Sequence, residues 1–319
     1  MERPKAVLRT IGGDPVLRFE RRFAHPPEKV WRAVSDPAEL AHWFPAEVRT
    51  EPRAGAPVRF AFPDEAPVPA DGGRGEVLEY DPPRVHAFTW NQDVLRFELF
   101  PDGEGCLLVF THTIGGGAPG RLTAGRDAHG WDVCLAALED RLSGAEFTPP
   151  GGMLQAVEAY VARFGLDQGE VLPSEDGRST VHFARDLGWT PVEKVWEILT
   201  GGEVPEPGAE PPAGFANSYV PPGPVSAAEA PHLLEYAWLH GGAPAGTVRW
   251  ELPHTPDVGT RVELSHTVPA GLAETLPTAL AAWQTHLEIL FAAVHGEVRC
   301  PWPEERTAEL ERMYAARLG

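Results

Sequence analysis

One amphipathic segment, residues 126–142, constrains the fold of this chain more than any other feature of its sequence. Its apolar residues follow one another at intervals of four, three and four: Trp131, Leu135, Leu138 and Leu142. This spacing is that of one face of an α-helix. Charged side chains occupy the opposite face. A helix with a single apolar stripe, headed by a tryptophan, needs a concave apolar surface to lie in. The segment therefore predicts a long helix held in a concave surface.

The same pattern recurs near the end of the sequence, which predicts that the chain makes this arrangement twice. Trp283 follows Trp131 by 152 residues, and the apolar positions after it keep that offset. Three further motifs recur in the same order: Glu28-Lys-Val-Trp31 as Glu193-Lys-Val-Trp196, Pro83–Trp90 as Pro231–Trp238, and Thr111-His-Thr113 as Ser265-His-Thr267. Matched motifs in a fixed order are typical of an internal repeat.

The first half reads as a strand, two helices, a run of strands and then the long helix. Alternating apolar residues predict strands at 16–23, 58–62, 75–80, 84–90, 95–99 and 106–114. Prolines at the first turn or just past the end place helices at 25–34 and 38–44, and a satellite helix at 153–164 closes the half. Helices segregated on one face of a run of antiparallel strands form an α+β design. The predicted fold class is therefore α+β, in two tandem copies.

The motifs divide the chain into two predicted domains. Residues 1–165 form the first, residues 166–177 a polar linker, and residues 178–319 the second. The second copy departs from the first over residues 201–224, which are rich in Gly, Pro and Glu and have no counterpart of Asp36–Phe44. We therefore expect a degenerate second copy, in which the short helix is lost or remodelled.

Charge and composition exclude several classes of protein. With a formal net charge of −19, the chain should repel phosphate groups, so neither nucleic acid nor an anionic membrane is an expected partner. No run of about 18 apolar residues could cross a bilayer, and residues 1–15 lack the apolar core of a signal peptide. Cys106, Cys134 and Cys300 are widely spaced, which argues against a disulfide framework or a zinc site and favours the cytoplasm.

Five motifs of the first half carry a family resemblance. They are Pro27-Glu-Lys-Val-Trp31, Asp36-Pro-x-x-Leu-x-x-Trp-Phe44, Gly75-x-Val-x-x-x-x-Pro-Pro83 before Trp90, Thr111-His-Thr113, and Gly130-Trp-x-x-x-Leu-x-x-Leu138. Together they resemble the SRPBCC (START-like) superfamily and, within it, the domain named after the activator of the heat-shock protein 90 ATPase. The resemblance implies a helix-grip fold, in which a bent antiparallel sheet wraps around a long C-terminal helix with a cavity between them. Members bind apolar ligands, act as cyclases on such ligands, or serve as co-chaperone modules.

Two histidines are candidates for a polar group in the expected cavity. His112 alternates with apolar residues along its strand, as His266 does in the second copy. The period of two turns both side chains toward the helix and cavity rather than toward water. Such a histidine is either a ligand anchor or acid–base group tuned by burial, or a neutral ring satisfied by a backbone or hydroxyl partner. The second role is the more common one for a buried polar group.

Aromatic side chains could also line the cavity, although core packing is the more common role of any single one. Trp43 and Phe44 end a short helix before Pro45, a suitable position for a lid over a cavity mouth. The ligand-binding candidates in the first copy are Trp43, Phe44, Phe60, Phe62, Trp90, Phe97, Phe110, His112, Trp131 and Leu135. Those in the second copy are Tyr236, Trp238, Trp250, His266 and Trp283.

The functional expectation combines the resemblance with the absence of catalytic motifs. The sequence has no G-x-S-x-G, H-E-x-x-H, P-loop or dinucleotide fingerprint, so no catalytic residue, metal or cofactor is predicted. We expect a cytoplasmic binding protein with a cavity for a small apolar or amphipathic ligand in the first domain, the second being mainly structural. One alternative is an aromatase/cyclase-like enzyme acting on a polyketide-type ligand. The other is a co-chaperone-like module, whose protein partner the sequence does not specify.

Overall fold

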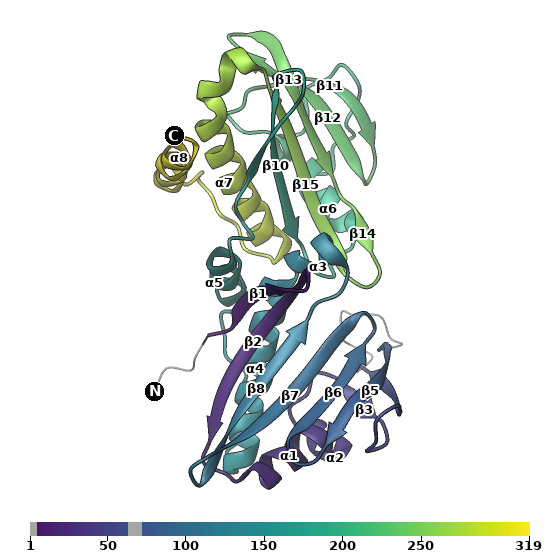
Figure 1. Ribbon diagram of the computed structural model, residues 1–319. Helices are drawn as coiled ribbons and strands as arrows, with labels where there is room; N and C mark the ends of the chain where they lie inside the picture. Colours follow the sequence, from purple (N-terminus) through teal and green to yellow (C-terminus); the bar gives the residue numbers. More distant parts are fainter. Residues whose placement is uncertain (1–4, 63–71) are drawn as a thin grey trace. The chain divides into compact units, whose positions relative to one another are not determined.

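The computed structural model describes residues 5–62 and 72–319, and the chain divides into two compact units, Met1–Phe164 and Gly165–Gly319 (Figure 1). Each unit combines an antiparallel sheet with a long helix near the C-terminal end of the unit. This architecture confirms the predicted fold class, α+β with two helix-grip domains.

The first unit is built on an eight-stranded antiparallel sheet with the order β1-β2-β8-β7-β6-β5-β4-β3. Its strands are β1 (Val7–Ile11), β2 (Asp14–Phe23), β3 (Glu47–Arg49), β4 (Pro57–Ala61), β5 (Arg74–Asp81), β6 (Val85–Trp90), β7 (Asp93–Asp102) and β8 (Gly105–Thr113). Its helices are α1 (Pro27–Ser35), α2 (Pro37–Leu40), α3 (Gly117–Leu122), α4 (Ala124–Ser143) and α5 (Met153–Phe164).

Helix α4 is the long helix expected at 126–142, and it lies along the sheet (Figure 1). Its apolar stripe is buried, as a helix held in a concave surface requires. On another face α5 packs closely against it at Gly125, where a Cβ atom would lie 2.5 Å from the Val161 side chain. Glycine at this position therefore lets α5 approach α4, and both helices contribute walls to the pocket of the first unit described below.

The second unit has a seven-stranded sheet with the order β11-β12-β13-β15-β10-β9, and β14 pairs with β15. Its strands are β9 (Glu170–Pro173), β10 (Ser179–Asp186), β11 (Pro222–Glu229), β12 (Leu233–His240), β13 (Ala243–Glu251), β14 (His254–Thr255) and β15 (Gly259–Val268). Its helices are α6 (Val192–Thr200), η1 (Ala213–Phe215), η2 (Ala270–Thr275), α7 (Leu276–Val294) and α8 (Glu304–Leu318). Read from β9 to β11, this order matches that of β1-β2-β8-β7-β6-β5 in the first unit, with β9 in the place of β1, and it has no counterpart of β4 and β3.

The stretch expected to be a polar linker, residues 166–177, is folded into the second unit. It contains β9, which pairs with β10, and Leu166 is buried. A Cβ atom at Gly169 would lie 2.3 Å from the Phe183 ring, so the backbone there packs directly on the core. Three of the four β9 side chains are exposed, as on other edge strands, so the pairing leaves no buried–exposed alternation along the strand.

Two other stretches differ from the sequence expectation in detail. Strands β1 and β3 were not expected, because most of their side chains are exposed and so leave no apolar alternation. The segment 201–224 is remodelled around the short helix η1. Its Phe215 is fully buried, against the rings of Trp196 and Trp250, so an aromatic anchor has replaced the longer helix of the first unit.

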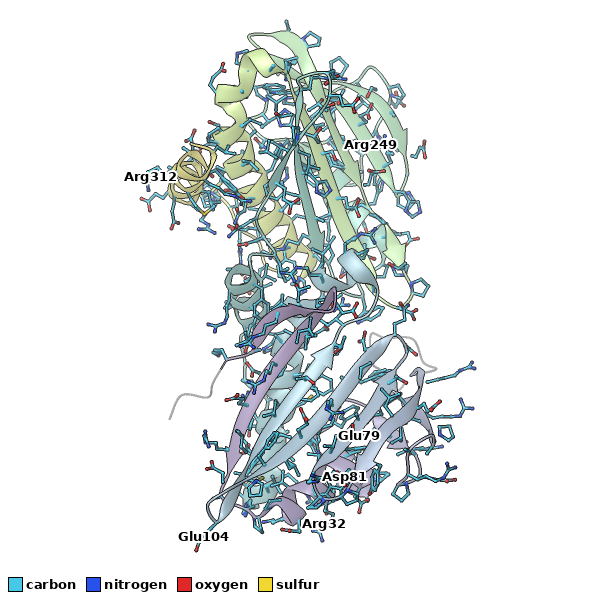
Figure 2. All side chains as sticks on the ribbon, viewed as in Figure 1. Arg32, Glu79, Asp81, Glu104, Arg249 and Arg312 are labelled. Carbon is cyan, nitrogen blue, oxygen red and sulfur yellow. The ribbon has the colours of Figure 1, made fainter. Side chains whose placement is uncertain are left out.

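Charged side chains cover the faces of the sheets that point away from the long helices. In the first unit Glu79 is one of them (Figure 2), and it pairs with Arg96 at 2.6 Å. In the second, Arg249 pairs with Glu251 at 3.1 Å (Figure 2). Exposed pairs of this kind contribute about 0–1 kcal/mol each. The apolar face between sheet and helix is therefore what holds each unit together.

Candidate functional site

A chain of three polar side chains joins α4 to the sheet of the first unit. The indole Nε1–H of Trp131 donates to Nδ1 of His112 at 3.0 Å. The other ring nitrogen, Nε2, lies 2.9 Å from Oδ2 of Asp93 on the neighbouring strand β7. Because Nδ1 accepts a hydrogen bond, the proton of the neutral ring must be on Nε2, which then donates to the carboxylate. The geometry therefore selects one neutral tautomer of His112.

Asp93 also organises the turn that leads from the sheet to the helices. Its second oxygen, Oδ1, accepts a hydrogen bond from the backbone N–H of Gly115 at 2.7 Å. The side chain of Asp93 remains 35% exposed. One carboxylate thus links β7, the end of β8 and the following turn, and it also presents negative charge to solvent beside the His112–Trp131 pair.

A second carboxylate, Asp127, lies one helical turn before Trp131. Its side chain accepts a hydrogen bond from the Thr123 hydroxyl and is 3.7 Å from the Arg126 guanidinium. Burial raises the pKa of Asp127, although the Arg126 cation and His112 act in the opposite direction. The start of α4 therefore carries a polar cluster, in contrast to the apolar remainder of its stripe.

An aromatic wall extends from Trp131 across the sheet. We define it by the rings of Phe44, Phe60, Phe62, Trp90 and Trp131. Phe60 and Phe62 stack on Trp90 with centroid separations of 4.4 and 5.6 Å. Phe44 bridges this stack to Trp131, at 5.6 Å from the Trp90 ring and 5.5 Å from that of Trp131. Phe62 and Trp90 are partly exposed and the other rings are buried, so the wall runs from the core to the surface.

The remaining candidates of the first unit lie deeper. Phe97 and Phe110 stack on each other at 4.6 Å and are fully buried, as is Leu135. Trp43 is buried too, and its Nε1–H donates to the carbonyl oxygen of Ala33 at 2.8 Å. The structure thus packs Trp43 and Phe44 into the core. The expected lid role of the two side chains stays a prediction.

In the second unit the histidine–tryptophan contact recurs without the carboxylate. Nε1 of Trp283 donates to Nδ1 of His266 at 3.2 Å. The strand position corresponding to Asp93 is Gly246, and Nε2 of the His266 ring is buried with no hydrogen-bond partner. The imidazole ring of His266 meets the Trp238 ring edge to face, with their centroids 4.6 Å apart. Burial lowers the pKa of His266 to about 3.

The other candidates of the second unit form a closed core. Trp250 and Trp283 meet edge to face at 5.7 Å, and the Tyr236 hydroxyl donates to the carbonyl oxygen of Phe215 at 2.6 Å. All these side chains are buried. His286, which was not expected, stacks on Trp283, and its Nε2–H donates to the carbonyl of Gly214 at 2.9 Å. Its position one turn after Trp283 on the helical stripe is the signal that could have identified it.

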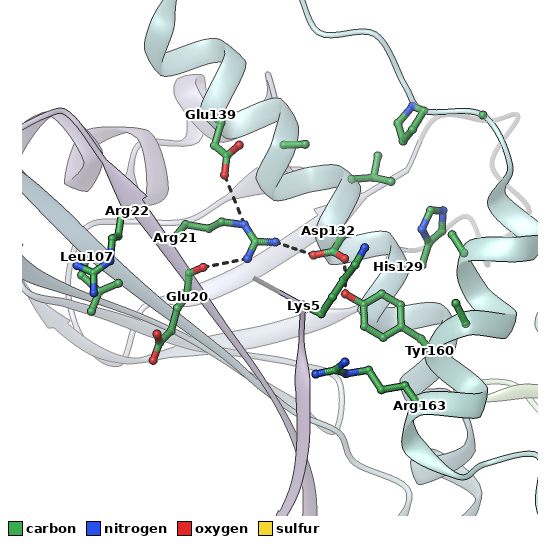
Figure 3. Close-up of a pocket in the computed structure, with 16 residues that line it drawn as sticks. Lys5, Glu20, Arg21, Arg22, Leu107, His129, Asp132, Glu139, Tyr160 and Arg163 are labelled. Atoms are coloured by element: carbon green, nitrogen blue, oxygen red, sulfur yellow. Dashed lines mark hydrogen bonds and ion pairs between the residues drawn. The ribbon is translucent and has the colours of Figure 1, made fainter. Parts of the chain in front are cut away.

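A pocket that the sequence did not reveal lies on another face of α4 (Figure 3). Its volume is about 1060 Å³, and it is walled by β2, α4, α5 and Lys5. None of the ligand-binding candidates lines it. His129 and Asp132 both line it. Asp132 binds Arg21 at 2.6 Å. Because Arg21 and Asp132 are distant in sequence, periodicity could not bring them together.

The comparison with protein families bears on the first unit. Residues 24–143 match the family model of the Activator of Hsp90 ATPase homolog 1-like protein. This stretch of the first unit is similar to that family. The matched range includes the Trp131–His112–Asp93 chain and all five rings of the aromatic wall. The second unit lies outside the matched residues.

The chain is also similar to several solved structures. EF2215 from Enterococcus faecalis, titled a conserved protein of unknown function, is 21% identical with TM-score 0.43, over 50% of this chain and 91% of that one. CalU16 from Micromonospora echinospora is 23% identical with TM-score 0.40, over 50% and 95%. BPP1335 from Bordetella parapertussis is 28% identical with TM-score 0.38, over 50% and 91%. No curated protein matches the chain.

The match over residues 24–143 supports a ligand-binding or cyclase-like domain and is compatible with a small ligand. Within residues 5–62 and 72–319, no three His, Cys, Asp or Glu side chains gather closely enough to hold a metal ion. Over the same ranges, every helix is too short or too polar to span a lipid bilayer.

Proposed function

We propose that the first unit binds a small apolar or amphipathic molecule at the aromatic wall, and that the second unit is mainly structural. The observation that carries this proposal is the stack of Phe60, Trp90 and Phe62, in which the central Trp90 ring and the Phe62 ring are partly exposed. Stacked rings beside solvent offer a face on which a flat apolar ligand gains both burial and ring contacts.

Polar groups lie beside the Trp131 end of the aromatic wall, and they are the reason for proposing that the ligand can be amphipathic. Trp131 contacts Phe44 on one side and binds His112 on the other, so the apolar rings are continuous with the half-exposed carboxylate of Asp93. A molecule lying along the wall would place its apolar body near Trp90 and a hydrogen-bond donor near Asp93. Ligand pockets commonly have this composition, with mainly apolar walls and a few fixed polar groups.

The geometry favours binding over the cyclase-like alternative. Both ring nitrogens of His112 are engaged, Nδ1 by Trp131 and Nε2 by Asp93. Before the ring could accept a proton from a substrate, it would have to lose the bond to Trp131. A histidine held in this way is a structural connector between helix and sheet.

The co-chaperone-like alternative requires a continuous exposed apolar patch. The most exposed large apolar side chains of the described residues are Val204 and Val298, at 81% and 88%. They lie in separate loops of the second unit, one after α6 and one after α7. Isolated exposed side chains of this kind are normal on a protein surface and supply no docking face.

The proposal is tested with Nile red, an uncharged flat probe whose fluorescence rises in apolar surroundings. We expect saturable binding to the full chain and at least tenfold weaker binding to Trp90→Ala, which removes the central ring of the stack. Trp302→Ala, at a partly buried tryptophan of the second unit, is the matched control and should bind as the wild type does. Equal binding by the Trp90 and wild-type proteins, or no saturable binding, would refute the proposal.

A further inference from the structure

The pocket between α4 and α5 of the first unit has a polar floor whose charged side chains pair with one another. Arg21, 2% exposed, binds Asp132 at 2.6 Å and Glu139 at 3.4 Å (Figure 3). The Tyr160 hydroxyl donates to Asp132 and accepts from the backbone N–H of Ala6 at 3.2 Å. Each of these groups thus has protein partners, and the floor is rigid before any ligand arrives.

The rim of the pocket carries cations that the floor does not neutralise. Lys5 lies over the Tyr160 ring, 5.9 Å from its centroid, and Arg163 follows Tyr160 by one helical turn on α5. Neither side chain has an ion-pair partner among the described residues. The lining as a whole holds four basic and three acidic side chains. This excess of one positive charge stands out in a chain whose net charge is −19.

Between rim and floor the walls are apolar. They come from β8, α4 and α5 and consist of Leu107, Val133, Ala136, Ala156 and Ala159. The volume of about 1060 Å³ is at the upper end of the range for small-molecule sites. A molecule that fits these walls and this charge has an apolar body and one anionic group.

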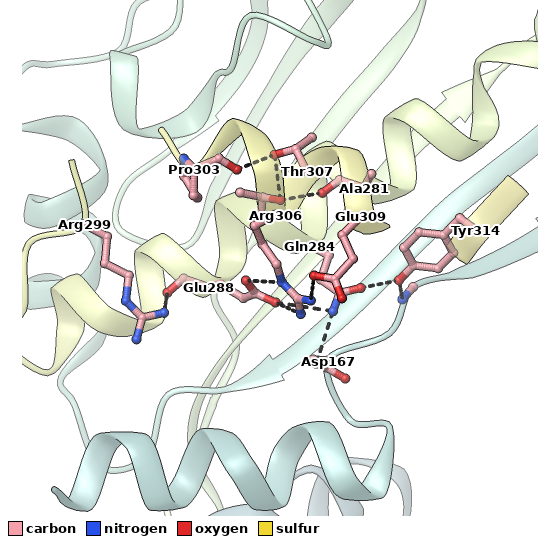
Figure 4. Close-up of polar contacts among 12 residues, drawn as sticks. Asp167, Ala281, Gln284, Glu288, Arg299, Pro303, Arg306, Thr307, Glu309 and Tyr314 are labelled. Carbon is pink, nitrogen blue, oxygen red and sulfur yellow. Dashed lines mark hydrogen bonds and ion pairs between the residues drawn. The ribbon is translucent and has the colours of Figure 1, made fainter. Parts of the chain in front are cut away.

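The second unit has counterparts of several of these residues. Arg185 occupies the β10 position that corresponds to Arg21, but its guanidinium lies 4.2 Å from the ring of Phe291, the counterpart of Glu139. The Tyr314 hydroxyl donates to Gln284 at 2.6 Å and accepts from Gly169 N–H at 2.9 Å (Figure 4). The contacts of the tyrosine are therefore kept, whereas an aromatic ring stands in place of Glu139.

We propose that this pocket binds a small amphiphile with a single anionic head group, such as a carboxylate, held by Lys5 and Arg163. The apolar body lies against α4 and α5, and the Arg21–Asp132–Tyr160 floor keeps the two helices apart. The site is separate from the aromatic wall, because it uses another face of α4. The inference therefore stands whether or not a ligand occupies the wall.

Three probes with one apolar body test the charge requirement: octanoate, octan-1-ol and octyltrimethylammonium, titrated into the full chain by calorimetry. We expect octanoate to bind at least tenfold more tightly than either of the others, since a charge-assisted contact contributes about 1.5–3 kcal/mol. Comparable affinity for octan-1-ol, or tighter binding of the cationic probe, would overturn the assignment.

Matched variants locate the site. The double variant Lys5→Gln/Arg163→Gln should weaken octanoate binding about tenfold or more. Arg22→Gln removes one positive charge from the same lining and should leave the affinity unchanged, because Arg22 is already paired with Asp102. A loss of octanoate affinity in Arg22→Gln as large as that in the double variant would show that only the overall charge matters, and it would refute the site. Trp90→Ala separates the two proposals, since it should weaken Nile red binding at least tenfold and leave octanoate binding intact.

Discussion

Trp131 donates its indole hydrogen to Nδ1 of His112 at 3.0 Å, and Trp283 makes the same contact with His266 at 3.2 Å. In each unit the bond connects the head of the long helix to the central part of the sheet. An indole nitrogen is only a donor, so Nδ1 of each histidine is the acceptor of this bond. The contact therefore fixes the position of the helix on the sheet.

Trp131 should be the most sensitive position of the first unit. Trp131→Ala removes a buried aromatic side chain and should lower the free energy of unfolding by about 3–5 kcal/mol. Trp131→Phe keeps most of the ring but leaves Nδ1 of His112 without its donor, at a cost of about 1–3 kcal/mol. Urea unfolding followed by circular dichroism measures both. An unchanged midpoint for the alanine variant would contradict the role of Trp131 in holding the helix.

Asp93 should matter through its charge as well as its hydrogen bonds. In Asp93→Asn the amide oxygen can still accept from Gly115, but the amide hydrogens then face Nε2–H of His112. We expect a loss of about 1–3 kcal/mol in the free energy of unfolding. Asp102→Asn, at the exposed end of the same strand, is the control and should cost less than about 1 kcal/mol. Equal effects at the two positions would show that the His112–Asp93 bond is not formed.

Arg21 and Arg22 offer a direct comparison between adjacent residues of the same type. Arg21→Ala leaves Asp132 and Glu139 without their shared cation and should cost about 3–5 kcal/mol. The Arg22 side chain is 68% exposed, so Arg22→Ala should cost less than about 1 kcal/mol. Thermal unfolding of the two variants checks the difference. Similar melting temperatures would mean that the floor of the pocket does not support the fold.

The stability of the second unit should fall in mild acid. Burial lowers the pKa of His266 to about 3 and that of His286 to about 4, from 6.5. Between these values and 6.5 the unfolded chain binds more protons than the folded one, so stability is lost as the pH decreases. The slope approaches about 1.4 kcal/mol per pH unit for each histidine. Urea midpoints at pH 7, 6 and 5 measure it.

A variant tests the origin of this slope. His266→Leu removes one of the two titrating histidines, so the stability of the variant should depend less steeply on pH. The stability of the variant at pH 7 also changes. His42→Gln, at an exposed site of the first unit, is the control and should keep the wild-type slope. An unaltered slope in the His266 variant would assign the acid sensitivity to other groups.

The architecture could be predicted from the sequence because it depends on periodicity. The stripe of α4 and the alternation around His112 and His266 are local patterns, and both histidines face the long helices as expected. His112 is buried and hydrogen-bonded. Its partners are an indole and a carboxylate rather than the backbone or hydroxyl group that was expected.

The edge strands and the segment 201–224 could not be predicted from the same rules. Strands β1 and β9 expose most of their side chains, so their pairing leaves no trace in the apolar pattern. The packing of Phe215 depends on rings from α6 and β13. A Gly- and Pro-rich composition contains no information about such contacts.

The sequence by itself determined the fold class and the inward face of each long helix, because those properties depend on residues a few positions apart. Only the tertiary structure decided which polar atoms meet. Arg21 and Asp132 are 111 positions apart in the chain, and the pocket they support exists only because α4, α5 and β2 come together. Contacts between distant side chains depend on packing in three dimensions, which no local spacing encodes.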